Sequence, residues 1–517
     1  MQISMAISSS FHDPHFYSLS ISEWREEYQW QMVLNFINCN KQCACFHKAF
    51  EIRKHAFNWE TLEFWGFIFV MLAAVMEERD ERSPSRSPVR CQYFRFSCPA
   101  CGILSLEIYL GLFSFLDIYD INATGAVIEE LKRLIEPTED RKYSYSAKVT
   151  YNVLSFGAKA NGRLDSRSAF LKAWGLACST TNPAIIYVPI GRYLIGSAIT
   201  FSGQACKSKA ITMKIDGTLV APSTYNAIGN AQIWIKFYRT NHVTISGGTL
   251  DAQGSSLWAC KSSGKTCPKG ATTLGIYHSQ NIVIRNLRSL NSQMFHILLY
   301  ACTNAKLQGV SVSAPRLSPN TDGIHLSSST GVTILNSKIS TGDDCISIGP
   351  GSSNVWIEKV VCGPGHGISI GSLGWDVVEA GVQNVTVKTA TFIGSDNGLR
   401  IKTWARRSNG FVKDVVFQHA SMVNVKNPIL IDANYCPNNE NCPNQVSGVK
   451  ISNVLYEDVH GTSATRVAVK FDCRKGKPCT NIRLKDVNLK YGGQPAVSSC
   501  SYAAGTASGL LQPTSCL

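Results

Sequence analysis

The sequence predicts an all-β protein, a right-handed parallel β-helix with a short N-terminal capping helix. Three observations favour this fold: short β-branched runs from about Tyr151 onward, a strand-like phrase that recurs, and few hairpin dipeptides such as Asn-Gly. The phrase reads Asn or Gly, then Val or Ile, one further residue and another β-branched residue, followed by alternating polar and apolar residues. Such repeats stack as the coils of a solenoid, each burying its apolar side chains on the next. A β-sandwich is the competing fold, but it would need more hairpin signals.

The recurring phrase defines the expected coils. It starts at Asn241, Asn281, Asn304, Gly331, Asn354, Asn384, Gly448 and Asn481. Two pairs of neighbouring starts, 281 with 304 and 331 with 354, are each 23 residues apart. Before the first phrase, the helical stretch SRSAFLKAWGLACS, Ser166 to Ser179, is predicted to cover the open apolar end of the first coil.

The charge of the chain changes near residue 145. Residues 1–145 hold 14 Lys and Arg against 19 Asp and Glu, whereas residues 146–517 hold 36 against 17. This positive excess favours a polyanionic partner, which could be nucleic acid, anionic lipid or an acidic polysaccharide. The cations are scattered, and the sequence has no zinc-finger spacing or RNA-binding aromatic motif, so nucleic acid is not expected. We therefore assign residues 146–517 to the β-helix domain.

Residues 1–145 are predicted to be an N-terminal extension that is partly disordered. The charged, Ser- and Pro-rich stretch from Glu77 to Arg90 indicates disorder. The apolar run from Phe64 to Met76 is thirteen residues long, too short for stable membrane insertion. We interpret it as a displaced signal segment, with a buried helix as the alternative. Cys98 and Cys101 form a CxxC without a second ligand pair, so no zinc site is expected there.

The nineteen cysteines, thirteen of them after residue 145, indicate an oxidising compartment and a secreted, extracellular protein. Sequons at Asn122 and Asn384 fit secretion. The predicted disulfides are Cys178 with Cys206, Cys260 with Cys267, Cys345 with Cys362, Cys436 with Cys442, Cys473 with Cys479, and Cys500 with Cys516. Cys302 would remain a free, buried thiol.

Three turns carry acidic or imidazole side chains in a regular series. Asp322 lies in SPNTDGIHLS, Asp343 and Asp344 lie in STGDDCISIG, and His366 lies in GPGHGISIGS. Both intervals, from Asp322 to Asp344 and from Asp344 to His366, are 22 residues, and each turn precedes nearly the same strand. Successive coils lie about 4.8 Å apart, so these side chains should form one column.

The expected column changes the interpretation of the Asp-Asp pair. Alone, Asp343 and Asp344 would be read as a solvated turn. Beside Asp322, three carboxyl groups cannot all ionise easily, so at least one pKa should rise and the titrations should couple. We expect Asp343 to keep its proton and Asp344 to lose it, as a general acid beside a general base requires.

A second polar element lies in GLRIKTW. Arg400 and Lys402 are two residues apart in a strand-like context and therefore share a face. Alone they would indicate a solvated edge strand. Next to a carboxylate groove they would suit a substrate carboxylate, which they can bind through charge-assisted hydrogen bonds.

Taken together, these blocks resemble the polygalacturonases of glycoside hydrolase family 28, in particular the secreted plant enzymes. The resemblance covers roughly residues 149–516 and rests on four blocks in order: Asn320-Thr321-Asp322-Gly323, Gly342-Asp343-Asp344, Gly365-His366-Gly367 and Arg400-Ile401-Lys402. It implies a pectin-lyase-like β-helix that hydrolyses α-1,4-linked galacturonic acid with inversion, in plant cell-wall remodelling. The partner would be an acidic polysaccharide, with no nucleic acid, cofactor or metal ion, and we expect a monomer in the cell wall.

The resemblance also implies roles for individual residues. By position, Asp343 matches the proton donor to the glycosidic oxygen, and Asp322 and Asp344 match the carboxylates that activate water. His366 would hold the protonation state of the cluster. Arg400 and Lys402 would bind the galacturonate carboxylate. Asn320 and Tyr435 would contribute to substrate binding.

Two departures from the family pattern and two rival functions accompany this assignment. Arg316 and Leu317 stand where relatives usually carry Gly and a small polar residue, and Ala433 stands where Gln is common, so affinity or local folding is expected to differ. A pectate-lyase-like eliminase would need a calcium cage and an Arg base. A catalytically silent polysaccharide-binding β-helix would keep only the fold. The His366 turn and the strand with Arg400 favour hydrolysis over elimination.

Overall fold

The computed structural model describes residues 148–437, 442–443 and 445–517. The extension predicted over residues 1–145, with its apolar run, its CxxC and the Asn122 sequon, lies outside the described residues. Across the described ranges, none of the helices has both the length and the apolar character needed to cross a bilayer.

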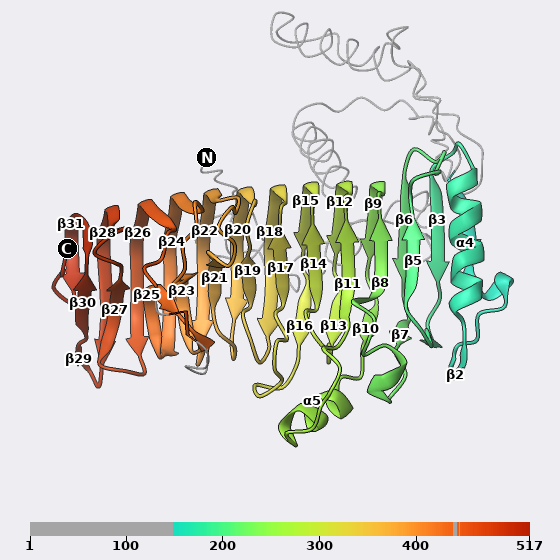
Figure 1. Cartoon of the computed structure of the whole chain (residues 1–517). Coiled ribbons are helices and arrows are strands. Elements are labelled where there is room, and N and C mark those ends of the chain that lie inside the picture. Colours follow the sequence, from blue (N-terminus) through green and yellow to red (C-terminus); the bar gives the residue numbers. More distant parts are fainter. Residues whose placement is uncertain (1–147, 438–441, 444) are drawn as a thin grey trace, which may run out of the picture. The chain divides into compact units, whose positions relative to one another are not determined.

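The strands form two sheets of parallel strands, one with twenty strands and one with eleven, here called sheet A and sheet B. The single antiparallel pair between the described strands joins β28 to β29 near the C-terminus. Coils follow one another from the end of the chain coloured cyan to the end coloured red (Figure 1). The predicted right-handed parallel β-helix is confirmed.

Sheet B comprises β5 (Ile199–Ser202), β8 (Ile233–Tyr238), β11 (Thr272–Tyr277), β14 (Ile297–Tyr300), β17 (Ile324–Ser327), β19 (Ile346–Ile348), β21 (Ile368–Leu373), β23 (Asn397–Trp404), β25 (Asn427–Tyr435), β27 (Val467–Asp472) and β30 (Val497–Ser501).

Sheet A comprises β1 (Val149–Asn152), β2 (Asn161–Asp165), β3 (Ala184–Val188), β4 (Arg192–Leu194), β6 (Ile211–Ile215), β7 (Thr218–Val220), β9 (Asn241–Ser246), β10 (Thr249–Asp251), β12 (Gln280–Arg285), β13 (Arg288–Leu290), β15 (Thr303–Gln308), β16 (Ser311–Ser313), β18 (Thr330–Ser340), β20 (Ser353–Cys362), β22 (Val382–Ile393), β24 (Phe411–Val425), β26 (Lys450–Ser463), β28 (Cys479–Tyr491), β29 (Gln494–Pro495) and β31 (Ala503–Gln512). The helices are η4 (Val153–Phe156), α4 (Arg167–Ser179), η5 (Tyr225–Ala227) and α5 (Ser255–Ser262).

Apolar side chains stack from coil to coil inside the solenoid. In sheet B, Ile324 pairs with Ile346 and Ile346 with Ile368, so the predicted 22-residue coil is confirmed. All three side chains are fully buried. Burying an Ile side chain contributes about 1.5–3 kcal/mol. Repeated over the coils, this inward row holds the turns before β17, β19 and β21 in register.

The Asn or Gly that opens each phrase has a structural reason. Asn281, Asn304 and Asn384 adopt left-handed backbone conformations, with φ of 53°, 56° and 53°. Asn and Gly tolerate this region better than other residues. The Asn304 side chain donates to Asn281 Oδ1 at 2.6 Å, and that of Asn384 donates to Asn354 Oδ1 at 2.6 Å. The Asn384 sequon therefore belongs to a structural ladder.

The predicted capping helix is confirmed as α4, which stands at the first coils (Figure 1). It buries Ala169, Phe170, Ala173, Trp174 and Ala177. These positions follow the 3–4 residue spacing of one helix face, so the helix covers the apolar end of the solenoid with its own apolar stripe. The Trp174 indole donates to the Ser202 carbonyl at 2.8 Å, which ties the helix to the end of β5.

All six predicted disulfides are present. Cys302 is a free thiol and 1% exposed, as expected. Burial raises the pKa of the Cys302 thiol to about 11. The thiolate is the reactive form of cysteine, so this side chain acts as a small apolar core residue.

Candidate active site

The candidate site lies where three successive coils turn into sheet B. Asp322 precedes β17, Asp343 and Asp344 precede β19, and His366 precedes β21. The strand register aligns these turns as the sequence predicted. Gly342, next to the pair, passes so close to the Ser318 backbone that a Cβ would lie 2.1 Å from the Ser318 carbonyl oxygen. A side chain at this position would therefore displace the turn.

Asp343 and Asp344 point to different partners. Asp343 Oδ1 lies 2.9 Å from His366 Nδ1, and the backbone N–H of Asp344 donates to the same oxygen at 2.8 Å. The Asp343 side chain keeps 19% of its surface exposed, whereas that of Asp344 is fully buried. The two neighbouring carboxylates thus occupy separate environments, one open to a substrate and one enclosed.

Asp344 is held by two cations. Arg400 Nη2 donates to Asp344 Oδ1 at 2.6 Å, and Lys402 Nζ donates to Oδ2 at 2.7 Å. Burial acts to raise the pKa of Asp344, but Lys402 and Arg400 outweigh it and hold this pKa at about 2. The shared face predicted for Arg400 and Lys402 is confirmed, and the lowered pKa of Asp344 favours the ionised form that the sequence predicted.

Asp322 has the opposite pKa shift. Its side chain is 7% exposed and accepts a hydrogen bond from Ser347 Oγ at 2.6 Å. Burial, followed by the charges of Asp343 and Asp344, raises the pKa of Asp322 well above its usual range. The sequence predicted a raised pKa within the cluster and assigned the retained proton to Asp343, whereas the raised pKa falls on Asp322.

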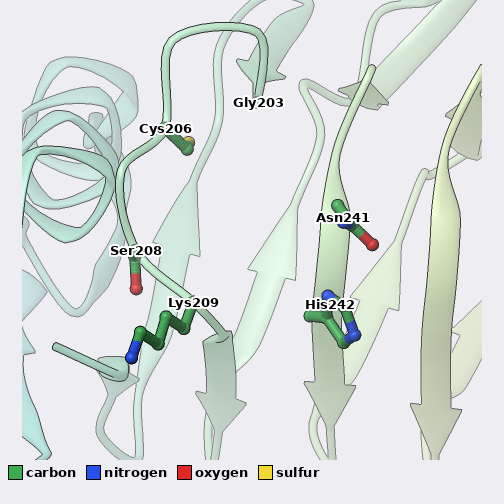
Figure 2. Close-up of a pocket in the computed structure, with 6 residues that line it drawn as sticks. All are labelled: Gly203, Cys206, Ser208, Lys209, Asn241 and His242. Atoms are coloured by element: carbon green, nitrogen blue, oxygen red, sulfur yellow. The ribbon is translucent and has the colours of Figure 1, made fainter. Parts of the chain in front are cut away.

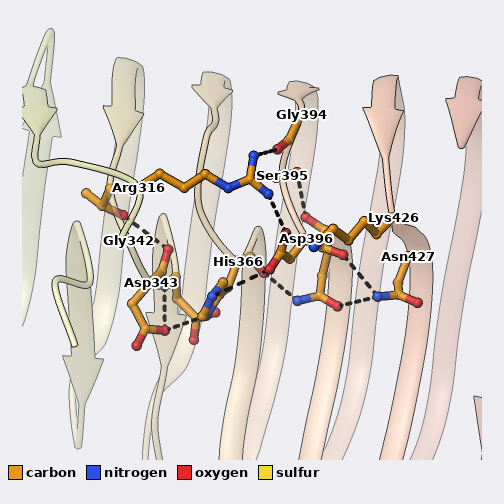
Figure 3. A network of polar contacts seen from close by, with 12 residues as sticks. Arg316, Gly342, Asp343, His366, Gly394, Ser395, Asp396, Lys426 and Asn427 are labelled. Atoms are coloured by element: carbon orange, nitrogen blue, oxygen red, sulfur yellow. Dashed lines mark hydrogen bonds and ion pairs between the residues drawn. The ribbon is translucent and has the colours of Figure 1, made fainter. Parts of the chain in front are cut away.

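His366 lies between two carboxylates. Its Nδ1 contacts Asp343, and its Nε2 lies 3.9 Å from Asp396 Oδ2. Burial lowers the pKa of His366, but the hydrogen bond and charge of Asp343 outweigh it, so this pKa lies above its usual value. Asp396 also pairs with Arg316 Nη2 at 2.9 Å and with Lys426 Nζ at 2.9 Å (Figure 3). Arg316, the departure from the family pattern, thus joins the surroundings of His366.

The two further predicted residues differ in position. Tyr435 lies at the end of β25, and Lys402 Nζ is 5.0 Å from its ring centroid, so this tyrosine borders the cluster. Asn320 is exposed in the turn before Asp322, with φ of 57°. No side-chain hydrogen bond joins Asn320 to the described residues of the cluster.

Sequence reasoning missed three residues of the site. His325 Nδ1 lies 2.7 Å from Ser347 Oγ, and Ser369 Oγ donates to Asp344 Oδ1 at 2.8 Å. Burial and the charge of Lys402 lower the pKa of His325 to about 4. The strand register aligns His325, Ser347 and Ser369. The strands GIHLS, CISIG and GISIG carry them at the same position, and comparing this position would have found them.

Three side chains of the cluster, Asp343, Asp344 and His366, form a group that could hold a cation. One ligand atom from each of Asp343, Asp344 and His366 lies within 4.8 Å of the others. Both oxygens of Asp344, however, already accept from Arg400 and Lys402. These residues fit an ion-paired carboxylate cluster better than the oxygen cage that Ca²⁺ prefers.

A separate hollow of about 340 Å³ shares no residue with this cluster (Figure 2). It is lined by Gly203, Cys206, Ser208, Lys209, Asn241 and His242. The lining contains no carboxylate side chain, so this hollow lacks the paired acid and base of glycoside cleavage.

Neighbouring carboxyl groups in different environments, Asp343 partly exposed and Asp344 enclosed by cations, are typical of the acid and base pair of a glycoside hydrolase. Comparison with known proteins agrees. The family model "Glycosyl hydrolases family 28" matches residues 178–514. The chain belongs to glycosyl hydrolases family 28.

Curated relatives cover most of the β-helix. A polygalacturonase of Prunus persica is 63% identical over 370 residues, which is 71% of this chain and 94% of the relative. An exopolygalacturonase of Platanus acerifolia is 43% identical over 71% of this chain and 98% of its own length. Membership of a hydrolase family gives the eliminase alternative no support.

Solved structures share the fold. The endo-xylogalacturonan hydrolase of Aspergillus tubingensis matches with a TM-score of 0.59 and 22% identity, over 70% of this chain and 100% of its own. The exopolygalacturonase of Thermotoga maritima matches with a TM-score of 0.58 and 19% identity, over 69% and 90% of the two chains. At these identities, the two structures support the β-helix fold.

Proposed function

We propose that this protein is a polygalacturonase that hydrolyses α-1,4-linked galacturonic acid in pectic polysaccharide with inversion of configuration. The observation that carries the proposal is the separation of the adjacent aspartates: Asp343 is partly exposed on His366, while Asp344 is enclosed by Arg400 and Lys402. Relatives named polygalacturonase support the substrate. The positive charge of residues 146–517 complements a polyanion.

In the proposed mechanism, Asp343 donates a proton to the glycosidic oxygen as the bond to the anomeric carbon breaks. Asp322 and Asp344 orient a water molecule on the opposite face of the sugar. That water forms the new bond to the anomeric carbon and gives its proton to Asp322. A single displacement of this kind inverts the configuration.

The proposed mechanism depends on which of the carboxyl groups, Asp343 or Asp322, carries a proton. In the resting protein the raised pKa belongs to Asp322. We propose that the cluster holds one proton, and that the reactive state is the one with this proton on Asp343 and with Asp322 ionised. The charge of Lys402 favours the ionised form of Asp322 that this state requires.

Arg400 and Lys402 are proposed to bind the galacturonate carboxylate while they keep Asp344 ionised. An ammonium group has three N–H donors and a guanidinium group has five, so both Lys402 and Arg400 keep N–H donors that are not used by Asp344. Lys402 is 6% exposed and Arg400 8%. Tyr435 would pack against the sugar beside them, and Asn320 would contact it from the exposed turn.

We further propose that residues 146–517 form the catalytic domain and that the protein acts outside the cell, in the cell wall, as a monomer. The six disulfides of the described residues need an oxidising compartment to form. Size-exclusion chromatography of the secreted protein checks the monomer, and the medium of a secreting plant-cell culture checks the location.

The test of function is release of reducing ends from polygalacturonate by the secreted protein, run for the full chain and for residues 146–517. Ultraviolet absorbance of the products, with and without chelator, is followed in parallel. We expect reducing ends without an unsaturated product and without an effect of chelator. A folded protein that releases none, or a chelator-sensitive unsaturated product, would overturn the proposal.

A further inference from the structure

The stretch of the chain that forms the middle coils is almost free of acidic residues. From residue 252 to residue 342, Asp322 of the catalytic cluster is the only Asp or Glu, against eight Lys and Arg. The strands of sheet A in this stretch are β12, β13, β15, β16 and β18, and none of them carries a carboxylate side chain. The cations on these strands are therefore not balanced within their own part of the sheet.

Four cations of these strands point outward from sheet A. Arg285, Arg288, Lys306 and Lys338 are exposed, and each directly follows a buried residue, as expected on the outer face of a strand. Over the part of the chain that the structure describes, none of the four makes an ion pair or a side-chain hydrogen bond. We call these four side chains the basic patch. Their N–H donors remain available to an external anion.

The strand register brings the four cations of the basic patch together. One residue of β16 pairs with both Arg288 and Lys338, so these two lie two coil steps apart, about 9.6 Å. Lys306 pairs with the residue two positions before Arg285, so Lys306 and Arg285 are diagonal neighbours about 8 Å apart. The corner at Asn286, with φ of 53°, lies between Arg285 and Arg288, which are at most about 11 Å apart. One polyanion can therefore contact cations from three successive coils.

The basic patch and the catalytic cluster belong to different sheets. The patch lies on sheet A, whose strands β12, β15 and β18 are neighbours in the middle of the solenoid (Figure 1). Arg400 and Lys402, the proposed ligands of the substrate carboxylate, lie on β23 of sheet B. A polymer segment on the outer face of sheet A is therefore separate from the segment held at the cluster.

Later strands of sheet A differ because they carry acidic side chains. Lys485 on β28 pairs with Glu457 on β26 at 2.6 Å. Asp458, also on β26, lies 2.9 Å from His419 Nδ1 and 2.9 Å from His460 Nδ1. Cationic groups there have carboxylate partners on their own or a neighbouring strand. The unbalanced positive charge is thus a property of the strands from β12 to β18 and not of sheet A as a whole.

The composition of these strands favours one class of polyanion. None of the five strands contains Phe, Tyr or Trp, and none of their large apolar side chains is exposed. Single-stranded nucleic acids bind on aromatic platforms, and membrane surfaces are bound through exposed aromatic or Leu side chains. The exposed neighbours of the patch include Gln308 and Ser313, which can form hydrogen bonds with sugar hydroxyls. These features fit an anionic polysaccharide.

We propose that the basic patch is a docking surface for anionic cell-wall polysaccharide, outside the catalytic site. The choice of polygalacturonate as the occupant rests on the proposed function. Its carboxylates recur along the chain, so one segment can form charge-assisted hydrogen bonds with several of the four cations at once. The surface holds the enzyme on a polymer network and takes no part in cleavage. It requires free carboxylates, so fully esterified pectin does not bind to it.

The test measures retention on immobilised polygalacturonate separately from turnover. The patch variant combines Arg285→Gln, Arg288→Gln, Lys306→Gln and Lys338→Gln in the full chain, with and without Asp343→Asn. Retention is measured in the Asp343→Asn background, with saturating trigalacturonate in the active site. We expect Kd for the polymer to rise by about tenfold, because four exposed ion pairs of about twofold each are lost. The difference should shrink at high salt, and turnover of trigalacturonate with Asp343 intact should change by less than about twofold.

A control variant removes the same charge elsewhere. Lys159 and Arg163 are exposed in the first coils, and Lys475 and Lys477 are exposed between β27 and β28. Replacing these four residues by Gln should leave both Kd for the polymer and turnover of trigalacturonate as in wild type. Turnover of trigalacturonate also shows that each variant is folded. Fully esterified pectin, which has no free carboxylates, should retain neither wild type nor the variants through the patch.

The outcomes separate the docking surface from the proposed function. A higher Kd in the patch variant alone supports the docking surface, whereas an unchanged Kd, or an equal rise in the control variant, overturns it. Patch-dependent retention on DNA-cellulose or on phosphatidylserine vesicles, with none on polygalacturonate, overturns the polysaccharide as the occupant. Wild type that cleaves neither trigalacturonate nor polygalacturonate overturns the proposed function, and the comparison of Kd values still decides the docking surface.

Discussion

Replacement of Asp344 by Asn should destabilise the folded protein, and the size of this loss should depend on pH in a defined way. The carboxylate is fully buried between Arg400 and Lys402, at 2.6 and 2.7 Å. Removing its charge leaves two buried cations without a counter-ion, and breaking such a pair costs about 3–5 kcal/mol. We expect a loss of this size in the free energy of unfolding at neutral pH.

The pH dependence follows from the pKa of Asp344, which falls from an ordinary 3.8 to about 2 in the folded protein. At 1.36 kcal/mol per pH unit, the difference is worth about 2 kcal/mol. A folded pKa below the unfolded one gives stability that is present above about pH 4 and lost as the pH falls through about 2. The gap in the free energy of unfolding between wild type and Asp344→Asn should therefore shrink by about 2 kcal/mol over this range.

The measurement is urea unfolding of both proteins between pH 2 and pH 7, followed by circular dichroism. Asp376→Asn, at an exposed position, is the matched control and should show a small, constant difference from wild type. A gap between wild type and Asp344→Asn that stays constant from pH 7 to pH 2 would refute the ionised, doubly paired carboxylate.

Three further predictions concern the neighbouring groups. Asp343→Asn should lower kcat by at least about 10²-fold, because it removes the proposed proton donor, while binding to immobilised polygalacturonate persists. Asp322→Asn should gain stability relative to wild type as the pH rises above 3.8, since the folded pKa of Asp322 lies above the unfolded one; urea unfolding at several pH values measures this. Asp396→Asn should move the alkaline limb of the pH–rate profile to lower pH, because His366 loses a carboxylate at 3.9 Å that favours its cation.

Each of these three predictions would be contradicted by a specific result. Unchanged turnover in Asp343→Asn would remove its role as the acid. An Asp322→Asn variant whose stability falls relative to wild type with rising pH would contradict the raised pKa of Asp322. A pH–rate profile of Asp396→Asn that superimposes on wild type would show that Asp396 does not act on His366, and Arg316→Gly should then have no effect on the profile.

The sequence predicted that Asp322, Asp344 and His366 lie in one column, because the coils that carry them have equal length. Ile324, Ile346 and Ile368 recur every 22 residues, so counting along the chain was equivalent to stacking in space. The contacts of Arg400 with Asp344 were not predicted, because the residues are 56 positions apart. Their meeting depends on the turns between β19 and β23, whose conformation no periodicity specifies.

The coil that contains β24 does not match the repeated phrase, for a local reason. Strand β24 pairs with β22 and β26, yet its sequence was not recognised as a repeat. Where the neighbouring strands have the left-handed Asn384 and Asn453, β24 has Asp414, with φ of 57°. The backbone conformation is retained with different side chains, so a pattern based on Asn could not identify it.

The paired residues Tyr238, Tyr277 and Tyr300 of sheet B show more clearly why counting along the sequence fails. Tyr238 and Tyr277 pair directly, although the loop with α5 and the Cys260–Cys267 disulfide lies between them in sequence. Tyr277 and Tyr300 belong to a much shorter coil. Insertions at the turns change the coil length without changing the strand register, because the stacked apolar residues fix the register and the turns only close the coil. A row of side chains can therefore be regular in space and irregular in sequence.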